Sequence, residues 1–302
     1  MLFRSDSDNS PMLARAPLLL SESLLFPYRE GLSFEQDGWM DRGQAAAFTG
    51  ALDRPPSSSW EIMNPREYEQ GHVPSVPYLP DIHSLVDNTY RPYDIGQVGQ
   101  LDLHILAGLF GGENAARDLT PAWDGGIYWA GQRLNATPAE QASTKSISFF
   151  YLSVWKNPGS AQAFTRMYAD ELGRKYSGLK AEKTEGSASN NGDGSLEQVY
   201  STAEGPVVIT RRGKLVFVSE SFDLPLARKL ASLILGAQGN GPLQSASIGR
   251  PTASPGNASL AASETLTAPM VHFLSNCGVT KAAVDAALKA AHSGAKVPLS
   301  QR

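Results

Sequence analysis

The sequence predicts an α+β fold: a helical and proline-rich N-terminal region, then a four-stranded, mainly antiparallel sheet with helices on one face. Two local residue patterns and the order of the predicted strands and helices support this fold class. Leu101, Ile105 and Leu109 recur at the four-residue spacing of a helix. Residues 147–155 place apolar groups on both faces of a strand. From 126 to 235 the order is strand, strand, helix, strand, strand, helix, which favours a sheet with packed helices.

The N-terminal region is predicted to contain several helices separated by proline-rich loop. Residues 1–10 are polar and are expected to fray. Pro27 is expected to separate two helices, and Pro55-Pro56 to stop a third. Residues 53–95 are expected to be extended loop, because prolines are frequent and periodic runs are few. The expected helices cover residues 13–25, 30–39, 43–52 and 97–110, with a short one at 113–119 after Gly111-Gly112.

The sheet region is predicted from strands at 126–134 and 147–155 and from a hairpin of 206–210 with 215–219. Asn157 followed by Pro158 is typical of a helix start, and Asp223 followed by Pro225 predicts a second one running to 235. Residues 177–195 are rich in Gly, Ser and Asn and are expected to form a loop.

We therefore expect three parts: a helical and loop-rich region (1–125), an α+β sheet domain (126–236), and a flexible linker with a C-terminal helix (237–302). Residues 279–291 form an Ala-rich amphipathic pattern. Its apolar face is shallow, so the pattern leaves open whether this helix docks on the rest of the chain.

Composition excludes several classes of protein. The chain has 302 residues, a net charge of −4 and an isoelectric point near 5.8, which argues against a nucleic-acid partner. Its single cysteine, Cys277, excludes an intrachain disulfide and is expected to be structural. We expect no transmembrane segment, because there is no apolar run of 18 residues, and no secretory signal pattern is present. The compartment is left unknown.

Two stretches carry a family resemblance: Phe26-Pro27-Tyr28-Arg29-Glu30-Gly31-Leu32-Ser33-Phe34, and residues 53–68 with Trp60-Glu61-Ile62-Met63-Asn64-Pro65. They resemble the middle of a little-characterised bacterial group of zincin-like, metallopeptidase-like proteins. In that group a helix with the zinc motif H-E-x-x-H precedes this segment, and the motif is absent here. The resemblance implies the C-terminal, substrate-side part of such a protein, from an envelope or secreted context. No catalytic, cofactor-binding or metal residue is carried over.

An alternative metal site is considered within one loop. The five histidines include no pair spaced four apart, but a group of carboxylates and histidines lies within 17 positions, and solvated loop residues are the preferred interpretation. Its members are Glu67, Glu69, His72, Asp81 and His83.

Other polar residues are assigned structural roles. Asn64 occupies a position that is often His in the resembling family, and it is expected to hydrogen-bond a turn before Pro65. His104 is expected to be a partly buried helix residue. Ser57-Ser58-Ser59 is expected to be a turn or an N-cap for the following helix.

The aromatic residues of the N-terminal region are expected to pack in a core, with a cleft wall as the alternative. They are Phe26, Tyr28, Phe34, Trp39, Trp60 and Tyr68.

Two functions from different classes follow. The preferred hypothesis is a non-catalytic module, truncated or split from a metallopeptidase-like protein, that packs against or binds a protein or peptide partner. It predicts an exposed apolar surface where further helices would pack. The alternative is a stand-alone metal-dependent hydrolase that uses the loop residues from Glu67 to His83. We assign no cofactor in either case.

Overall fold

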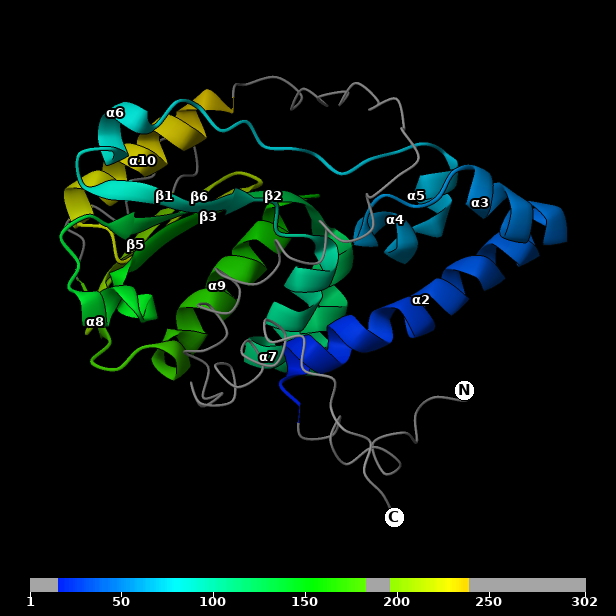
Figure 1. The fold of residues 1–302 in the computed structure, drawn as a ribbon, viewed down its shortest axis with the longest axis horizontal. Coiled ribbons are helices and arrows are strands. Elements are labelled where there is room, and N and C mark those ends of the chain that lie inside the picture. Colours follow the sequence, from blue (N-terminus) through cyan, green and yellow to red (C-terminus); the bar gives the residue numbers. More distant parts are fainter. Residues whose placement is uncertain (1–15, 183–195, 239–302) are drawn as a thin grey trace, which may run out of the picture.

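A computed structural model describes residues 16–182 and 196–238 and shows a mixed fold of helices and strands (Figure 1). Within these ranges one seven-stranded sheet has the order β1-β2-β3-β7-β6-β5-β4. Every neighbouring pair in it is antiparallel. The α+β class is therefore confirmed, and the predicted number of four strands is wrong.

The strands are, in chain order, Tyr90–Gly96 (β1), Trp123–Arg133 (β2), Ile147–Trp155 (β3), Lys180–Ala181 (β4), Leu196–Thr202 (β5), Gly205–Arg212 (β6) and Leu215–Glu220 (β7). The α-helices are Leu18–Arg42 (α2), Ala51–Asp53 (α3), Ser59–Met63 (α4), Pro65–Glu69 (α5), His83–Val86 (α6), Gln100–Leu119 (α7), Pro138–Gln141 (α8), Pro158–Lys175 (α9) and Leu224–Ala237 (α10). A π-helical turn covers Ala46–Gly50, and 3₁₀ turns cover Thr120–Ala122 and Thr144–Ser146.

Three strands were not predicted, namely β1, β4 and β5. They lie toward the two edges of the sheet, where most of their side chains are half-buried or exposed, so they lack the apolar run of a central strand. β1 even contains Pro92, which an edge strand tolerates because its outer N–H groups need no ladder partner.

β3 organises the two layers that cover the sheet. All nine of its residues are buried. Phe149 and Tyr151 belong to the core that α7 and α9 share with one face, whereas Phe150 and Leu152 belong to the core that α6 and α10 share with the other. The prediction of helices on one face only is therefore wrong. A strand with apolar side chains on both sides requires cover on both.

The two helix starts and the hairpin predicted in the sheet region are confirmed. The Asn157 side chain accepts a hydrogen bond from the Ser160 N–H at 2.9 Å, and Asp223 accepts one from the Leu226 N–H at 2.8 Å. These caps begin α9 and α10 where the sequence predicts helix starts. β6 and β7 form the predicted hairpin, and Gly213 supplies the positive φ of 57° at its turn.

A buried charge cluster joins the end of α9 to the end of β7. The Glu220 carboxylate accepts hydrogen bonds from the Lys175 ammonium at 2.5 and 2.7 Å and from the hydroxyls of Tyr168 and Tyr176. The Lys175 and Glu220 side chains are 1% and 0% exposed. The carboxylate accepts from several donors at once, which is the condition under which two charges can be buried together.

An extended segment connects the N-terminal helices to the sheet (Figure 1). The prediction of extended loop over residues 53–95 is wrong in part, because this range contains α4, α5, α6 and most of β1. The extended part is the segment from α5 to α6, which is attached at two points. The Ser75 hydroxyl donates to the Asp124 carboxylate at 2.7 Å, and the Gln238 side chain makes two hydrogen bonds to the backbone of Tyr78, of 2.7 and 3.0 Å. These bonds tie the segment to the start of β2 and to the end of α10.

The N-terminal helix differs from the prediction. α2 is one continuous helix of 25 residues that passes through Pro27, not two helices that Pro27 separates. Proline inside a helix removes one backbone hydrogen bond, and packing of the flanking residues must offset that loss. Phe26 and Phe34 are buried on either side of it, and Phe34 packs against Tyr68 of α5.

Several predicted features lie outside the described residues. They are the polar start at 1–10, the loop core at 183–195, the linker from 239 to 268, Cys277 and the helix at 279–291.

We expect Lys175→Met to lower the free energy of unfolding by about 3–5 kcal/mol, because it leaves a buried carboxylate without its counter-charge. Arg117→Met is the matched control, since it breaks an ion pair whose side chains are 71% and 70% exposed, and we expect a loss below about 1 kcal/mol. Urea unfolding followed by tryptophan fluorescence measures both. Equal losses in the two variants would contradict a stabilising role for the buried pair.

Candidate functional site

The outward side of α2 carries a row of large apolar side chains. Leu20, Leu24, Tyr28 and Leu32 are spaced four residues apart, so they follow one side of the helix, and Trp39 continues the row. Leu24, Tyr28, Leu32 and Trp39 are 63%, 72%, 57% and 55% exposed. At a rise of 1.5 Å per residue, the row from Leu20 to Trp39 extends over about 28 Å. We call these five residues the α2 face.

The Phe48 side chain of the π-helical turn enlarges this surface. Met40, Phe48 and Leu52 are exposed on α2, the π-helical turn and α3. The Trp39 and Phe48 rings have centroids 6.2 Å apart. Single exposed apolar residues are common on proteins, but a contiguous row of this length is typical of an interaction site.

A second side of α2, next to this row, is fixed by packing and hydrogen bonds. Phe34 meets Tyr68 edge to face, with ring centroids 5.1 Å apart. The Tyr68 hydroxyl donates to the Arg54 carbonyl, and the Arg54 guanidinium lies 3.9 Å from the Tyr68 ring centroid. Arg42 pairs with Glu69 of α5 at 2.5 Å. In Figure 1, α4 and α5 lie on one side of α2, and α2 forms an edge of the described structure.

The aromatic residues of the N-terminal region thus divide into two sets. Phe26, Phe34, Trp60 and Tyr68 are buried, as expected for core packing. Tyr28 and Trp39 are exposed, so the prediction that they belong to the core is wrong. Composition could not separate the sets, but the four-residue spacing of Leu20, Leu24, Tyr28 and Leu32 was a signal that sequence reasoning missed.

A small hollow borders the α2 face. It lies between α2, the π-helical turn, α3 and α5, and its volume of about 250 Å³ includes space open to solvent. Glu35, Arg42 and Glu69 line it, and one carboxylate oxygen of Glu35, Oε2, is buried without a hydrogen-bond partner in the described structure. The lining therefore carries two carboxylates, Glu35 and Glu69, against the one guanidinium of Arg42.

Beneath α2, a polar chain connects α4 to α7. The Asn64 side-chain amide donates to the Trp60 carbonyl at 2.7 Å and to Gln100 Oε1 at 2.6 Å. Gln100 in turn donates to the Thr120 carbonyl at 2.8 Å, and His104 Nδ1 lies 3.1 Å from the Thr120 hydroxyl. Asn64 therefore hydrogen-bonds the turn as expected, and both Asn64 and His104 have structural partners.

The serine turn also has the expected role. The Ser58 hydroxyl accepts from the Glu61 N–H at 3.4 Å and caps α4. Trp60, which follows in α4, is buried with its indole N–H unpaired in the described structure.

Asp102 is a buried carboxylate in the first turn of α7. It accepts a hydrogen bond from the Gly99 N–H at 2.7 Å. Burial raises the pKa of Asp102 to about 6, although the Gly99 N–H opposes part of that rise. Asp102 is the third residue of α7 and is buried.

The loop residues considered for a metal site are distributed among separate pairs. His72 contacts Glu67, Glu69 pairs with Arg42, and the His83 ring pairs with Asp87 at 3.1 Å. The Asp87 hydrogen bond raises the pKa of His83. Asp81 accepts from the His83 backbone N–H at 2.9 Å. In residues 16–182 and 196–238 no group of three or more His, Cys, Asp or Glu side chains could hold a metal ion.

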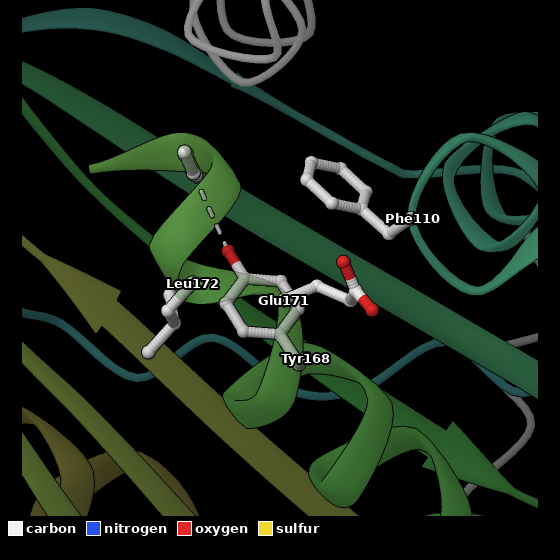
Figure 2. A pocket seen from close by; sticks show the side chains of 5 residues that line it. Phe110, Tyr168, Glu171 and Leu172 are labelled. Carbon is white, nitrogen blue, oxygen red and sulfur yellow. Dashed lines mark hydrogen bonds between the residues drawn. The ribbon is translucent and has the colours of Figure 1, made fainter. Parts of the chain in front are cut away.

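A second small hollow lies beside the buried charge cluster, between Phe110 of α7 and Tyr168 and Glu171 of α9 (Figure 2). Leu172 and Lys175 complete its lining, and its volume of about 180 Å³ includes space open to solvent. The space that each hollow encloses is far smaller than the 300–1,000 Å³ typical of small-molecule sites. The Lys175 ammonium beside it is already bonded to Glu220.

No helix in the described ranges has the length and apolar character needed to cross a bilayer. Comparison with known protein families, with curated proteins and with solved structures finds no match. The zincin-like resemblance therefore stays a prediction.

We expect Asp102→Asn to remove a pH-dependent cost to stability. Between the unfolded pKa near 4 and the folded pKa of about 6, the native protein holds a proton that the unfolded chain has lost, so stability falls as the pH rises. The Asn side chain can still accept from the Gly99 N–H. Relative to wild type, the variant should gain about 2–3 kcal/mol in free energy of unfolding between pH 4 and pH 7.

Chemical denaturation at several pH values measures this difference. Asp118→Asn is the control, because the Asp118 carboxylate is 70% exposed and should give no such divergence. A constant difference between Asp102→Asn and wild type from pH 4 to pH 7 would contradict the role assigned to Asp102.

Proposed function

We propose that this chain is a non-catalytic binding module that docks a protein or peptide partner on the α2 face. The observation that carries the proposal is the row from Leu20 to Trp39, which is apolar, exposed and set on a helix whose other side is anchored in the fold. A helix with this arrangement is suited to pack against another helix or to receive an apolar segment.

The size and rigidity of the surface support a specific interaction. The face extends over about 28 Å, a length comparable with the contact of two packed helices. Phe34, Tyr68 and Arg54 hold the buried side of α2 in one position, so little ordering of the helix is needed when a partner binds.

The resemblance gives the proposal a context. The exposed row lies within and around the stretch from Phe26 to Phe34 that resembles metallopeptidase-like proteins, at the point where that hypothesis predicts that further helices pack. We therefore propose that the module is related to the substrate-side part of metallopeptidase-like proteins. The metal-dependent hydrolase alternative gains no support in the described part of the chain, because its five residues lie in separate pairs.

The first test is photo-cross-linking in the cells that naturally make the protein. The photoreactive residue p-benzoylphenylalanine replaces Tyr28. We expect one discrete adduct, whose second component mass spectrometry identifies. Binding of that purified component is then measured by calorimetry. Leu24→Glu and Leu32→Glu should each weaken binding at least about tenfold, because they place a charge in the apolar contact.

Ser33→Glu is the matched control, because it adds the same charge at an exposed position of α2 outside the row. Its affinity should stay close to that of the wild type. The absence of a discrete adduct at Tyr28, or equal affinities for the Leu24, Leu32 and Ser33 variants, would contradict the proposal.

A further inference from the structure

The charge of α2 restricts what can cover its apolar face. The helix contains five acidic residues and two basic ones, for a net charge of −3. A second copy of α2 would bring the same excess of negative charge to the contact. A segment with basic side chains beside its apolar ones is therefore the favoured occupant.

The chain itself contains such a segment after the last described residue. Residues 239–302 have a net charge of +3, and residues 270–291 within them, with Lys281, Lys289 and Asp285, have a net charge of +1. Within them, residues 270–291 hold the larger apolar side chains together with Lys281 and Lys289. These apolar residues are Met270, Val271, Phe273, Leu274, Val279, Val284 and Leu288.

The intervening chain is long enough to reach α2. The described structure ends at Gln238, which is bonded to Tyr78 of the extended segment. From 239 to 269 there are 31 residues, which span about 100 Å when extended and about 30 Å on average as a flexible coil. Such a tether gives an effective concentration on the order of millimolar, so even a weak contact becomes populated.

The hollow beside the α2 face supplies a specific partner for a lysine. Glu35 Oε2 is buried there without a hydrogen-bond partner in the described structure, and the lining carries two carboxylates against the single guanidinium of Arg42. An ammonium group from Lys281 or Lys289 at the mouth of the hollow would balance this excess of negative charge.

We propose that residues 270–291 of this chain bind the α2 face in the same molecule, with their apolar residues on Leu24, Tyr28 and Leu32 and a lysine at Glu35. The proposal rests on the docking role proposed for that face. It makes the C-terminal segment an internal ligand, which an outside partner must displace.

The native Cys277 gives a direct test in the full-length chain, because it is the single cysteine and lies inside the proposed segment. Leu24→Cys, Leu32→Cys and Trp39→Cys each place a second thiol on the α2 face. Lys145→Cys places one at an exposed position near α8, at the opposite end of the structure from α2 (Figure 1). Mild oxidation at low micromolar protein, with tryptic mass spectrometry, measures the rate of the intramolecular disulfide.

We expect at least one α2-face variant to form the disulfide with Cys277 about tenfold faster than the Lys145 variant. Adding Lys281→Glu and Lys289→Glu should remove most of that advantage. Equal rates at the α2 face and at position 145 would overturn the proposal. Disulfides only between two molecules would also overturn it, in favour of a second copy as the occupant.

The two proposals can fail separately. If the Tyr28 photo-adduct forms with another protein while the intramolecular disulfide does not, the internal ligand is wrong and the partner-binding function stands. If the intramolecular disulfide forms and no adduct to another protein is found, residues 270–291 cover the face and the partner-binding function fails.

Discussion

The fold depends on the burial of β3 on both of its faces. Its nine residues are all inaccessible, and successive side chains enter two different cores. One face requires α7 and α9, and the other requires α6 and α10, so a single strand dictates a three-layer arrangement. The remaining strands extend the sheet outward on either side until their side chains become half-buried and pairing ends at β1 and β4.

The N-terminal helices are held onto this frame through α7. α7 packs on α9 on one side and contacts α2 and α4 on the other. The Asn64 to Gln100 hydrogen bond and the buried Trp60 join α4 to α7, while Phe34 and Tyr68 join α2 to α5. α2 is therefore a well-anchored element at the periphery of the structure. Its buried side is used within the fold, and its apolar outer side is left for an occupant.

The charges of the molecule are used in two distinct ways. In the interior, Glu220 is fully engaged by Lys175 and two tyrosine hydroxyls, and Asp102 is bonded to a backbone N–H, so both have structural roles. Near the surface, Glu35 has one buried oxygen with no donor in the described structure. The α2 face and the hollow next to it are therefore the candidate functional surface, whereas the buried cluster stabilises the fold.

The sequence alone determined the local elements whose signals are short-range: the caps at Asn157 and Asp223, the Gly213 turn, the strand at 147–155 and the α+β class. Only the tertiary structure decided the edge strands, the second helical layer and the passage of α2 through Pro27, since each depends on packing between distant residues. The same holds for the candidate site. The spacing of Leu20, Leu24, Tyr28 and Leu32 defines one side of a helix, but which side of that helix the fold covers is set by Phe34 and Tyr68, which lie on different helices.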